Sequence, residues 1–211
     1  MDAVSQELIF IYCIIVTASM AIPADVDDYL KLLSETIDKI DKNCLNEAIG
    51  ALLKVREEEG TVYIFGNGGS AATASHIVCD FNKGVSLNLD RKFRFVCLSD
   101  STSTVTAIAN DIGYDEIFRL QLKGRLKKND LVFAISGSGN SKNVINAVEY
   151  AREQGVKVLS LTGYSGGKLL KLSDYPIHVS VDNMQIAEDA HMMVCHLMAS
   201  VIARHLGEPM C

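Results

Sequence analysis

The chain has 211 residues, of which 48% are hydrophobic and 22% are charged. This composition excludes a disordered protein, a collagen and a disulfide scaffold, and the length favours one domain with a substantial core. Because 20 basic residues stand against 26 acidic ones, the net charge of −6 attracts neither nucleic acid nor an anionic membrane, and neither is expected as a partner.

The first 24 residues contain an apolar run, LIFIYCIIVT, over residues 8–17. Small residues follow this run as they do in a signal peptide, but no Lys or Arg precedes Lys31, and the run is too short to span a bilayer. Residues 1–24 are therefore expected to be an apolar N-terminal segment of doubtful status, either appended to the working domain or preceding a true start at Met20.

The cysteines indicate a reducing compartment. The chain has six cysteines, with no CxxC motif and no repeated spacing, and four of them lie in apolar runs. A cysteine in such a run behaves as a small buried hydrophobic residue. We therefore expect a cytoplasmic protein without disulfide bonds and without a cysteine-based zinc site.

Residues 25 to about 60 have the pattern of amphipathic helix, because apolar residues recur there every three or four positions. Asn43 is a candidate break between two helices. Beyond this region the apolar residues form short continuous runs of strand length, which predict strands at 61–66, 93–99, 130–136, 156–163 and 175–181.

Segments with a helical pattern separate these strands, including 71–81, 143–154 and 186–205. Apolar strands that alternate with helices are typical of a parallel sheet with helices on both faces. We therefore expect N-terminal helices over 25–60 and an α/β core over 61–211, built on a five-stranded parallel sheet.

Two glycine-rich turns follow predicted strands and lead into predicted helices. The first contains Asn67, Gly68, Gly69 and Ser70, and the second is SGSGNS at 136–141. Backbone N–H groups that converge at a helix N-terminus, with serine hydroxyls beside them, bind phosphate. Neither turn is a P-loop, and one such turn is commonly only a βα connection, but two at the carboxyl ends of strands favour a ligand site. With a lysine nearby in place of an arginine cluster, the second turn suits a phosphomonoester.

A histidine and a carboxylate follow the first turn at helical spacing. His76 and Asp80 are four residues apart, so their side chains share one helix face. Glu188, His191 and His196 on the last predicted helix are candidate partners, and nitrogen and oxygen ligands of this kind suit zinc. The alternatives are a surface hydrogen bond between His76 and Asp80, and a core or interface position for His191.

The chain resembles the SIS-domain phosphoheptose isomerases, in register from about residue 25 to residue 205. The resemblance lies in residues 64–84, IANDIGY (108–114), ISGSGNS (135–141), LTGYSGGK (161–168) and EDAHMMVCH (188–196). It implies a single flavodoxin-like SIS domain with an N-terminal helical extension, assembled as a homotetramer with sites between subunits. It also implies an aldose–ketose isomerase that converts sedoheptulose 7-phosphate into D-glycero-D-manno-heptose 7-phosphate for surface-polysaccharide heptose.

The resemblance also implies roles for individual positions. Asp80 is implied as base and metal ligand, Glu188 as ligand and alternative base, His196 as acid and ligand, and His76 as a further ligand, with zinc as the ion. The implied substrate-binding residues are Asn67, Gly68, Gly69, Ser70, Lys83, Asp111, Ser136, Gly137, Ser138, Asn140, Ser141 and Gln185. Such an isomerase moves a proton between C1 and C2 through an enediol, which requires a base and an acid and is assisted by a divalent ion.

Four positions depart from the family pattern. Asp80 stands where the family has glutamate, so its carboxylate lies about 1.5 Å further back. The Asp-x-x-Gln pattern of the last helix is here Gln185-x-x-Glu188, and Glu188 is suited to compensate for the shorter Asp80. Thr73 replaces an acid, and Gly84 replaces an arginine, with a lysine beside it.

Because these changes lie in the site, two other functions stay open. One is isomerisation of a different phosphosugar. The other is a non-catalytic SIS module that senses a phosphosugar or docks a replication-initiation protein. A docking module has no need of acids and histidines in ligand-like register, so the presence of His76, Asp80, Glu188 and His196 favours the enzyme.

Overall fold

The computed structural model, which describes residues 22–208, has a five-stranded sheet with the strand order β2-β1-β3-β4-β5. Each neighbouring pair is parallel, and all six residues of the central strand β3 are buried. The predicted α/β fold is thereby confirmed, whereas the apolar run at 8–17 lies outside the described residues. The strands are β1 (Val62–Phe65), β2 (Phe95–Cys97), β3 (Leu131–Ser136), β4 (Lys157–Thr162) and β5 (Tyr175–His178).

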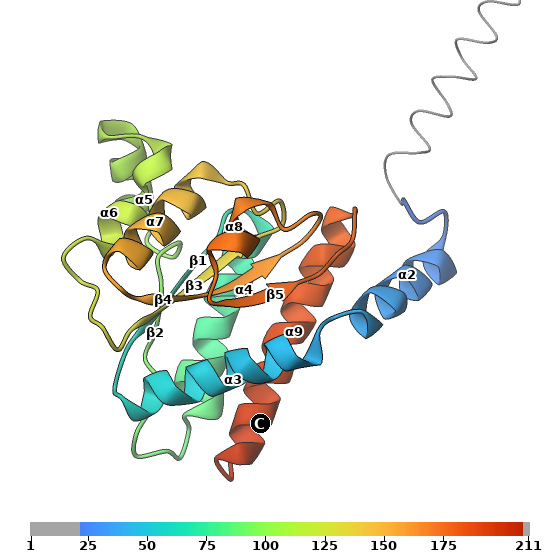
Figure 1. The fold of residues 1–211 in the computed structure, drawn as a ribbon, viewed down its shortest axis with the longest axis horizontal. Helices are drawn as coiled ribbons and strands as arrows, with labels where there is room; N and C mark the ends of the chain where they lie inside the picture. Colours follow the sequence, from blue (N-terminus) through green and yellow to red (C-terminus); the bar gives the residue numbers. More distant parts are fainter. Residues whose placement is uncertain (1–21, 209–211) are drawn as a thin grey trace, which may run out of the picture.

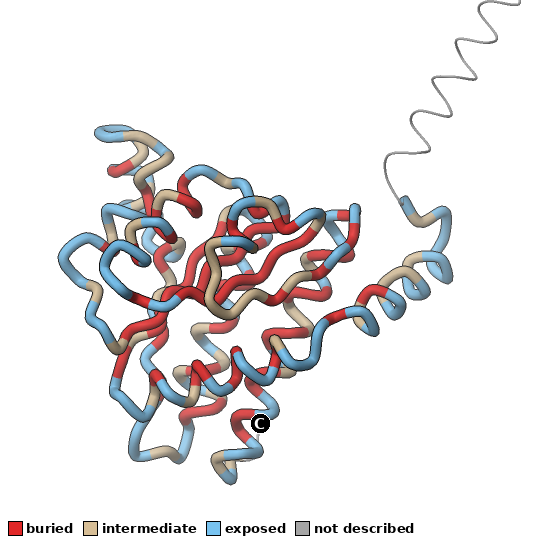
Figure 2. Tube along the Cα trace, viewed as in Figure 1, coloured by how far each residue is buried: buried red, intermediate tan, exposed pale blue. Residues whose placement is uncertain are grey.

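Helices cover both faces of the sheet (Figure 1). The helices packed on one face are α3 (Lys42–Glu57), α4 (Gly69–Cys79) and α9 (Met184–His205). The helices packed on the other are α5 (Thr102–Asp111), α6 (Arg119–Leu122), α7 (Lys142–Glu153) and α8 (Gly167–Leu172). Each face has its own apolar cluster, and Figure 2 shows that burial is concentrated in the strands and in the helix sides that face them.

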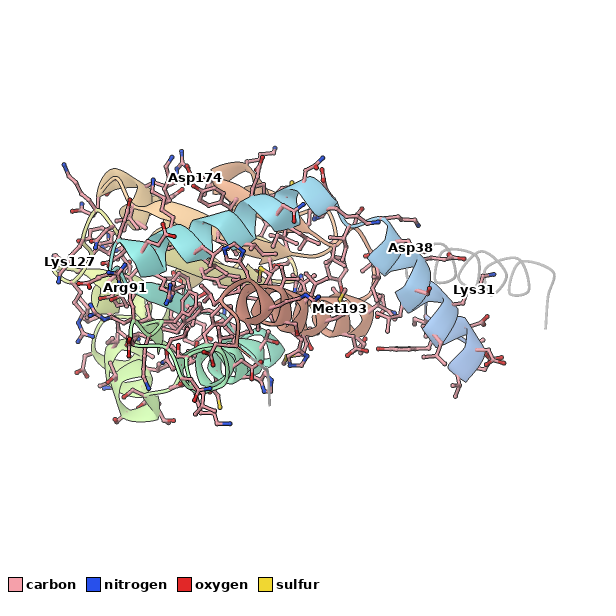
Figure 3. All side chains as sticks on the ribbon, turned by 90° about the horizontal axis from the view of Figure 1, so that it is seen from below. Lys31, Asp38, Arg91, Lys127, Asp174 and Met193 are labelled. Atoms are coloured by element: carbon pink, nitrogen blue, oxygen red, sulfur yellow. The ribbon has the colours of Figure 1, made fainter. Side chains whose placement is uncertain are left out.

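The N-terminal helical region consists of two helices. α2 (Val26–Asp38) extends past the end of the sheet, as Figures 1 and 3 both show. The break from α3 comes at residues 39–41, where Asp41 caps α3 by accepting the N–H of Asn43 at 2.7 Å. α2 is attached to α9 by the Tyr29 hydroxyl, which donates to Asp189 Oδ2 at 2.7 Å. This hydrogen bond to a carboxylate raises the pKa of Tyr29 to about 12.

The helix predicted at 71–81 begins earlier and ends differently. It starts at Gly69, directly after the first glycine-rich turn, and runs into a π-helical turn, η1 (Asp80–Val85). Phe81 in this turn is fully buried and stacks on Phe95, with ring centroids 4.4 Å apart. Wider turns of this kind occur most often at functional sites. The turn starts at Asp80, for which the family resemblance implies the role of a base.

α9 is the longest helix in the described part of the chain, and its apolar composition serves the core. By length and mean hydropathy (1.2) it is the one helix among residues 22–208 that is apolar enough to cross a membrane. Yet 56% of that stretch is buried inside the protein, against α3, α4 and the sheet. The core helix of an α/β domain has the same composition as a membrane span, so packing accounts for it.

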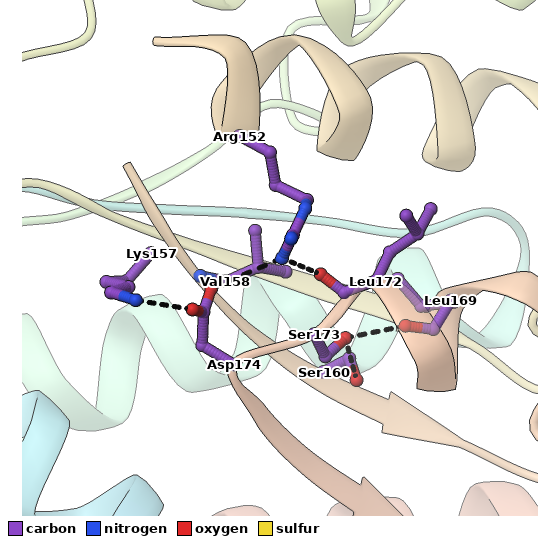
Figure 4. Close-up of polar contacts among 8 residues, drawn as sticks. All are labelled: Arg152, Lys157, Val158, Ser160, Leu169, Leu172, Ser173 and Asp174. Carbon is purple, nitrogen blue, oxygen red and sulfur yellow. Dashed lines mark hydrogen bonds and ion pairs between the residues drawn. The ribbon is translucent and has the colours of Figure 1, made fainter. Parts of the chain in front are cut away.

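A polar cluster fixes the edge strand β5 against β4 (Figure 4). Asp174, just before β5, accepts hydrogen bonds from Lys157 Nζ at 2.6 Å and from the Val158 backbone N–H at 3.0 Å. Ser173 Oγ lies 2.7 Å from both Ser160 Oγ and the Leu169 carbonyl oxygen. The cluster sets the register of β5, whose far end carries His178.

Candidate active site

Two glycine-rich loops meet at the carboxyl edge of the sheet. The first follows β1 and the second follows β3, and these two strands are paired neighbours. A Cβ on Gly66 would lie 2.9 Å from the Ile135 carbonyl oxygen, so the first loop passes directly over the end of β3. α4 and α7 begin at these loops, which directs the N-termini of both helices toward the same edge.

The second loop is organised by its own serines. Ser136 Oγ lies 3.3 Å from Ser141 Oγ and accepts the backbone N–H of Gly139 at 3.2 Å. Gly139 has φ +64, and a Cβ there would lie 2.0 Å from the Gly166 carbonyl oxygen. Only glycine fits, because both the positive φ and the close backbone contact exclude a side chain. Ser138, which is exposed, is the serine of this loop most open to a ligand.

A third loop, LTGYSGGK at 161–168, braces the second. The Asn140 side chain accepts the backbone N–H of Lys168 at 3.1 Å and donates to the Ser138 carbonyl at 3.1 Å. The Leu169 N–H donates to the Gly139 carbonyl at 3.0 Å. The structure therefore gives the Asn140 side chain a place in the loop scaffold, with one amide N–H left for a ligand.

The Asn67 side chain is also held by protein groups. It forms a pair of amide hydrogen bonds with Asn143 of α7, and it accepts a third from the Tyr114 hydroxyl at 2.9 Å. The sequence alone predicts a role for neither Asn143 nor the Tyr114 side chain, although Tyr114 ends the family-like segment IANDIGY. A signal for Asn143 was present, since it repeats at four-residue spacing with the buried Ala147 and Ala151 on the core side of α7.

Two histidines and one carboxylate come together between α4 and α9. His76 Nε2 lies 2.9 Å from His196 Nε2, and Asp80 Oδ2 lies 3.3 Å from the first and 3.6 Å from the second. One ligand atom from each of these three residues lies within 4.8 Å of the others. The predicted approach of His196 to the His76 and Asp80 pair is therefore what the structure shows, across 120 residues of sequence.

The donor set of this cluster fits a metal ion. Asp80 Oδ2 is buried and has no hydrogen-bond partner, so a carboxylate oxygen points at two imidazole nitrogens without a proton donor that satisfies it. The two histidine side chains are 46% and 50% exposed, so the cluster is open on one side. Two imidazoles with a carboxylate and an open position form a typical divalent-ion site.

Glu188 lies apart from this cluster in the same chain. A Cβ on Gly69 would be 2.3 Å from Glu188 Oε1, which places the carboxylate against the first turn of α4. His196 is eight residues further along α9, about 12 Å along the helix axis. The carboxylate is well placed for the partial positive charge of the α4 N-terminus. Within one chain, Glu188 therefore faces the glycine-rich loops, and the histidine cluster lies two turns away.

His191 is a core residue. It is 1% exposed, and among residues 22–208 neither ring nitrogen has a partner with full hydrogen-bond geometry. Burial lowers the pKa of His191 to about 4, so its imidazole is neutral at neutral pH. Of the two interpretations open from sequence, the structure supports the core position. His178, at the end of β5, has a pKa lowered by partial burial, and its Nδ1 lies 3.1 Å from Thr162 Oγ1.

The remaining predicted residues divide between the two ends of α4. Gln185 is exposed in the first turn of α9, beside Met184, whose Sδ would lie 2.8 Å from a Cβ on Gly137. Lys83 is exposed on η1, roughly 20 Å along the axis from Gly69. In one chain, Gln185 therefore lies near the second loop and Lys83 lies beyond the histidine cluster.

Asp111 and the buried serines complete this survey. Asp111 is exposed at the C-terminal end of α5, where its Oδ1 accepts the Asn110 side-chain N–H at 2.8 Å. Ser70 and Ser136 are 6% and 4% exposed, so their hydroxyls lie at the bases of the two loops. The exposed residues of the two loops are Gly68, Gly69, Ser138 and Asn140.

Comparison with known proteins identifies this architecture. Residues 26–163 match the SIS domain family. A phosphoheptose isomerase of Helicobacter pylori (strain P12) is 40% identical over 164 residues, which cover 77% of this chain and 84% of that protein. The phosphoheptose isomerase of Neisseria gonorrhoeae superposes with a TM-score of 0.73 at 29% identity, over 83% of this chain and 93% of that one.

A second solved structure agrees. The phosphoheptose isomerase of Francisella tularensis has a TM-score of 0.77 at 27% identity, covering 84% of this chain and 94% of that one. The SIS domain match begins at residue 26, so it includes the helical N-terminal region as well as the strands up to β4. The chain therefore belongs to the phosphoheptose isomerase family of SIS-domain proteins.

Proposed function

We propose that this protein is an aldose–ketose isomerase that converts sedoheptulose 7-phosphate into D-glycero-D-manno-heptose 7-phosphate. The observation that carries the proposal is the cluster of His76, Asp80 and His196, because it supplies a carboxylate and two imidazoles in a chain whose relatives are phosphoheptose isomerases. A cytoplasmic location and a role in surface-polysaccharide heptose belong to the same proposal.

The reaction requires a proton to move between C1 and C2 of the sugar. Asp80 or Glu188 removes a proton from C1 of the ketose while His196 gives a proton to the C2 carbonyl oxygen, which forms the enediol. The base then delivers its proton to C2 while the O1 hydroxyl returns a proton to His196, which leaves the C1 aldehyde of the aldose. Asp80 Oδ2 is suited to the role of base because no protein N–H or O–H is hydrogen-bonded to it. The exposed ring of His196 is suited to exchange its proton with bound sugar.

His76, Asp80 and His196 would hold a divalent ion, with zinc as the proposed metal and Glu188 as a further ligand from sequence analogy. When bound, such an ion polarises the sugar carbonyl and stabilises negative charge on the enediolate. The protein's own contribution is to orient the ligands. Because His76 and Asp80 lie one turn apart on α4 and η1, a single helix face sets their spacing.

The phosphate end of the substrate is proposed to bind at the second glycine-rich loop, through backbone N–H groups, Ser136, Ser138 and Ser141. This assignment needs more than one chain. Asp80 lies roughly 16 Å along α4 from Gly69. We therefore propose a homotetramer in which the loops of one subunit and the histidine cluster of another form each site.

A surface suited to such assembly lies between the N-terminal helices and α9. A groove of about 350 Å³ is lined largely by apolar side chains of α2, α3 and α9, among them Ile37, Met193 and Val201. Val201 is 44% exposed, and α2 adds the exposed Val26 and Leu30. An apolar groove with exposed apolar side chains beside it is typical of subunit contacts.

The test is incubation of the full-length protein with sedoheptulose 7-phosphate, followed by NMR of the products. We expect the aldose phosphate to form, and we expect a chelator to reduce the rate with recovery on addition of zinc. Asp80→Asn and His196→Ala should each abolish the reaction, while His205→Ala, an exposed histidine on the same helix, should leave it unchanged. Full activity in both site variants would refute the assignment, and a panel of other phosphosugars would identify a different substrate.

A further inference from the structure

Asn143 is a buried polar residue whose side chain is hydrogen-bonded to one other side chain. It lies in the first turn of α7, two residues after the SGSGNS loop, and it is 2% exposed. A buried amide that is not hydrogen-bonded destabilises a protein, so such a residue is tolerated only where its groups are satisfied. The partners of Asn143 therefore show what this position does.

The partner is Asn67 of the first glycine-rich loop. Asn143 Nδ2 donates to Asn67 Oδ1 at 2.9 Å, and Asn67 Nδ2 donates to Asn143 Oδ1 at 2.9 Å. The orientation of the pair is set by the Val144 backbone N–H, which donates to Asn143 Oδ1 at 2.9 Å. Because that N–H can only donate, the Asn143 atom beside it is the oxygen, which fixes which Asn143 atom accepts from Asn67 and which one donates to it.

This pair uses most of the hydrogen-bonding capacity of Asn67. Its Oδ1 accepts from Asn143 and from the Tyr114 hydroxyl, so both lone pairs are occupied. Its Nδ2 donates one of two N–H groups to Asn143, which leaves one N–H for a ligand. The Asn67 side chain can therefore donate one hydrogen bond, in a fixed direction, to a sugar phosphate. The carbonyl oxygen of Asn67 cannot accept a hydrogen bond from a sugar hydroxyl.

We propose that Asn143 is a positioning residue, which holds Asn67 and thereby fixes the first glycine-rich loop relative to the second. The pair joins the loop after β1 to the helix that starts after β3, and the Tyr114 hydroxyl connects the segment after α5 to the same amide. The catalytic consequence rests on the proposed isomerase function, whereas the coupling between the two asparagines does not.

The test is a double-mutant cycle of Asn67→Ala and Asn143→Ala in the full-length protein. For kcat/KM with sedoheptulose 7-phosphate, we expect each single variant to lose ~10- to 100-fold, because misplacement by about 1 Å has effects of that size. The kcat/KM of the double variant should be within twofold of that of the less active single variant. In both single variants, the decrease in kcat and the increase in KM should account for the same shares of the loss in kcat/KM. Losses that multiply would overturn the proposal, since the two residues would then act independently.

The test includes a control variant on α7 and a second variant that removes only one hydroxyl group. Glu149 lies on the same helix α7 and is exposed, so Glu149→Ala should leave kcat/KM unchanged. If Asn143→Ala does not fold, Tyr114→Phe removes one hydroxyl from an exposed side chain. We expect it to lower kcat/KM two- to fivefold in the wild type and not at all in Asn67→Ala. An equal loss in both backgrounds would overturn the proposal.

The same cycle is measured by urea unfolding, which separates this proposal from the proposed function. Coupling between Asn67 and Asn143 in stability, with no isomerisation of sedoheptulose 7-phosphate by the wild type, would refute the function and retain the pair. In that case kcat/KM is measured on whichever phosphosugar the wild type isomerises. Additive effects on stability would refute the pair whatever the substrate is.

Discussion

Asp80 lies close to two histidines despite a side chain one methylene shorter than the glutamate that the family pattern implies. Its Oδ2 lies 3.3 Å and 3.6 Å from the Nε2 atoms of His76 and His196, so the cluster closes around the shorter carboxylate. The pairing of His76 with Asp80 could be predicted, because four-residue spacing on a helix is a local property. The approach of His196 could be proposed only as a candidate, because it depends on how α9 lies against α4.

Replacement of Asp80 tests its role in the cluster. We expect Asp80→Asn to lower kcat by ~10²- to 10⁴-fold, because it removes a general base without changing the volume of the side chain. It should also lower the metal content of the purified protein, measured by elemental analysis. Asp80→Glu should keep activity within about tenfold of wild type. The exposed Asp90→Asn variant is the control, and an Asp80→Asn enzyme with wild-type kcat would exclude the carboxylate from the chemistry.

His191 makes the stability of the fold depend on pH. Its pKa in the folded protein, about 4, lies below the unfolded value of about 6.5. Because the unfolded state binds the proton more readily, the stability that the neutral imidazole provides is complete above pH 6.5 and is lost as the pH falls toward 4. Between pH 7 and pH 5 this loss amounts to about 2 kcal/mol.

We therefore expect His191→Gln to flatten the acid side of the stability profile. Urea unfolding at pH 7, 6 and 5 should show wild type losing about 2 kcal/mol more than the variant over this range. His205→Gln, which replaces an exposed histidine at the end of α9, should keep the wild-type dependence. If wild type and His191→Gln change in parallel, His191 is not the group that titrates.

At the scale of the elements, the strands were predictable and their order was not. Continuous apolar runs identify strands because a parallel strand is buried on both faces, as all of β3 is. The order β2-β1-β3-β4-β5 depends on contacts between distant segments, which no local pattern contains. The π-helical turn at Asp80–Val85 also involves a contact between distant segments, since Phe81 in the turn packs on Phe95 of β2.

The loop after β3 shows how such contacts constrain single positions. Gly139 and Gly124 both have positive φ, +64 and +75, but a Cβ on Gly139 would lie 2.0 Å from a backbone oxygen, whereas no atom lies within 4 Å of a Cβ on Gly124. Gly124→Ala should therefore destabilise by about 1–2 kcal/mol, the strain of the backbone alone. Gly139→Ala should destabilise by more and abolish phosphate binding, measured by urea unfolding and calorimetry with inorganic phosphate. Equal destabilisation by both would contradict the contact between the second and third loops.

At the scale of the whole molecule, the proposed phosphate-binding loops and the histidine cluster of one chain lie too far apart to form one site. α4 and α9 have the glycine-rich loops and Glu188 at one end and the histidine cluster about two or three turns away. The eight-residue spacing of Glu188 and His196 already implies this separation, because on one helix it places the two residues about 12 Å apart along the axis. A second subunit can bring its loops to the cluster, and the apolar groove beside α2 and α9 is a surface on which it can pack.

Complementation between inactive chains tests whether two subunits share each site. Asp80→Asn disables the histidine cluster, and Ser138→Asp places a negative charge in the phosphate loop at an exposed position. If each site takes its cluster from one chain and its loop from another, a mixed pair has one site with both substitutions and one site with neither. Random pairing makes half of the pairs mixed, so co-expression of the two inactive chains should restore about a quarter of wild-type kcat. The two proteins purified separately and then combined without exchange should stay inactive. Inactive co-expressed assemblies would show that one chain supplies both the cluster and the loop of its own site.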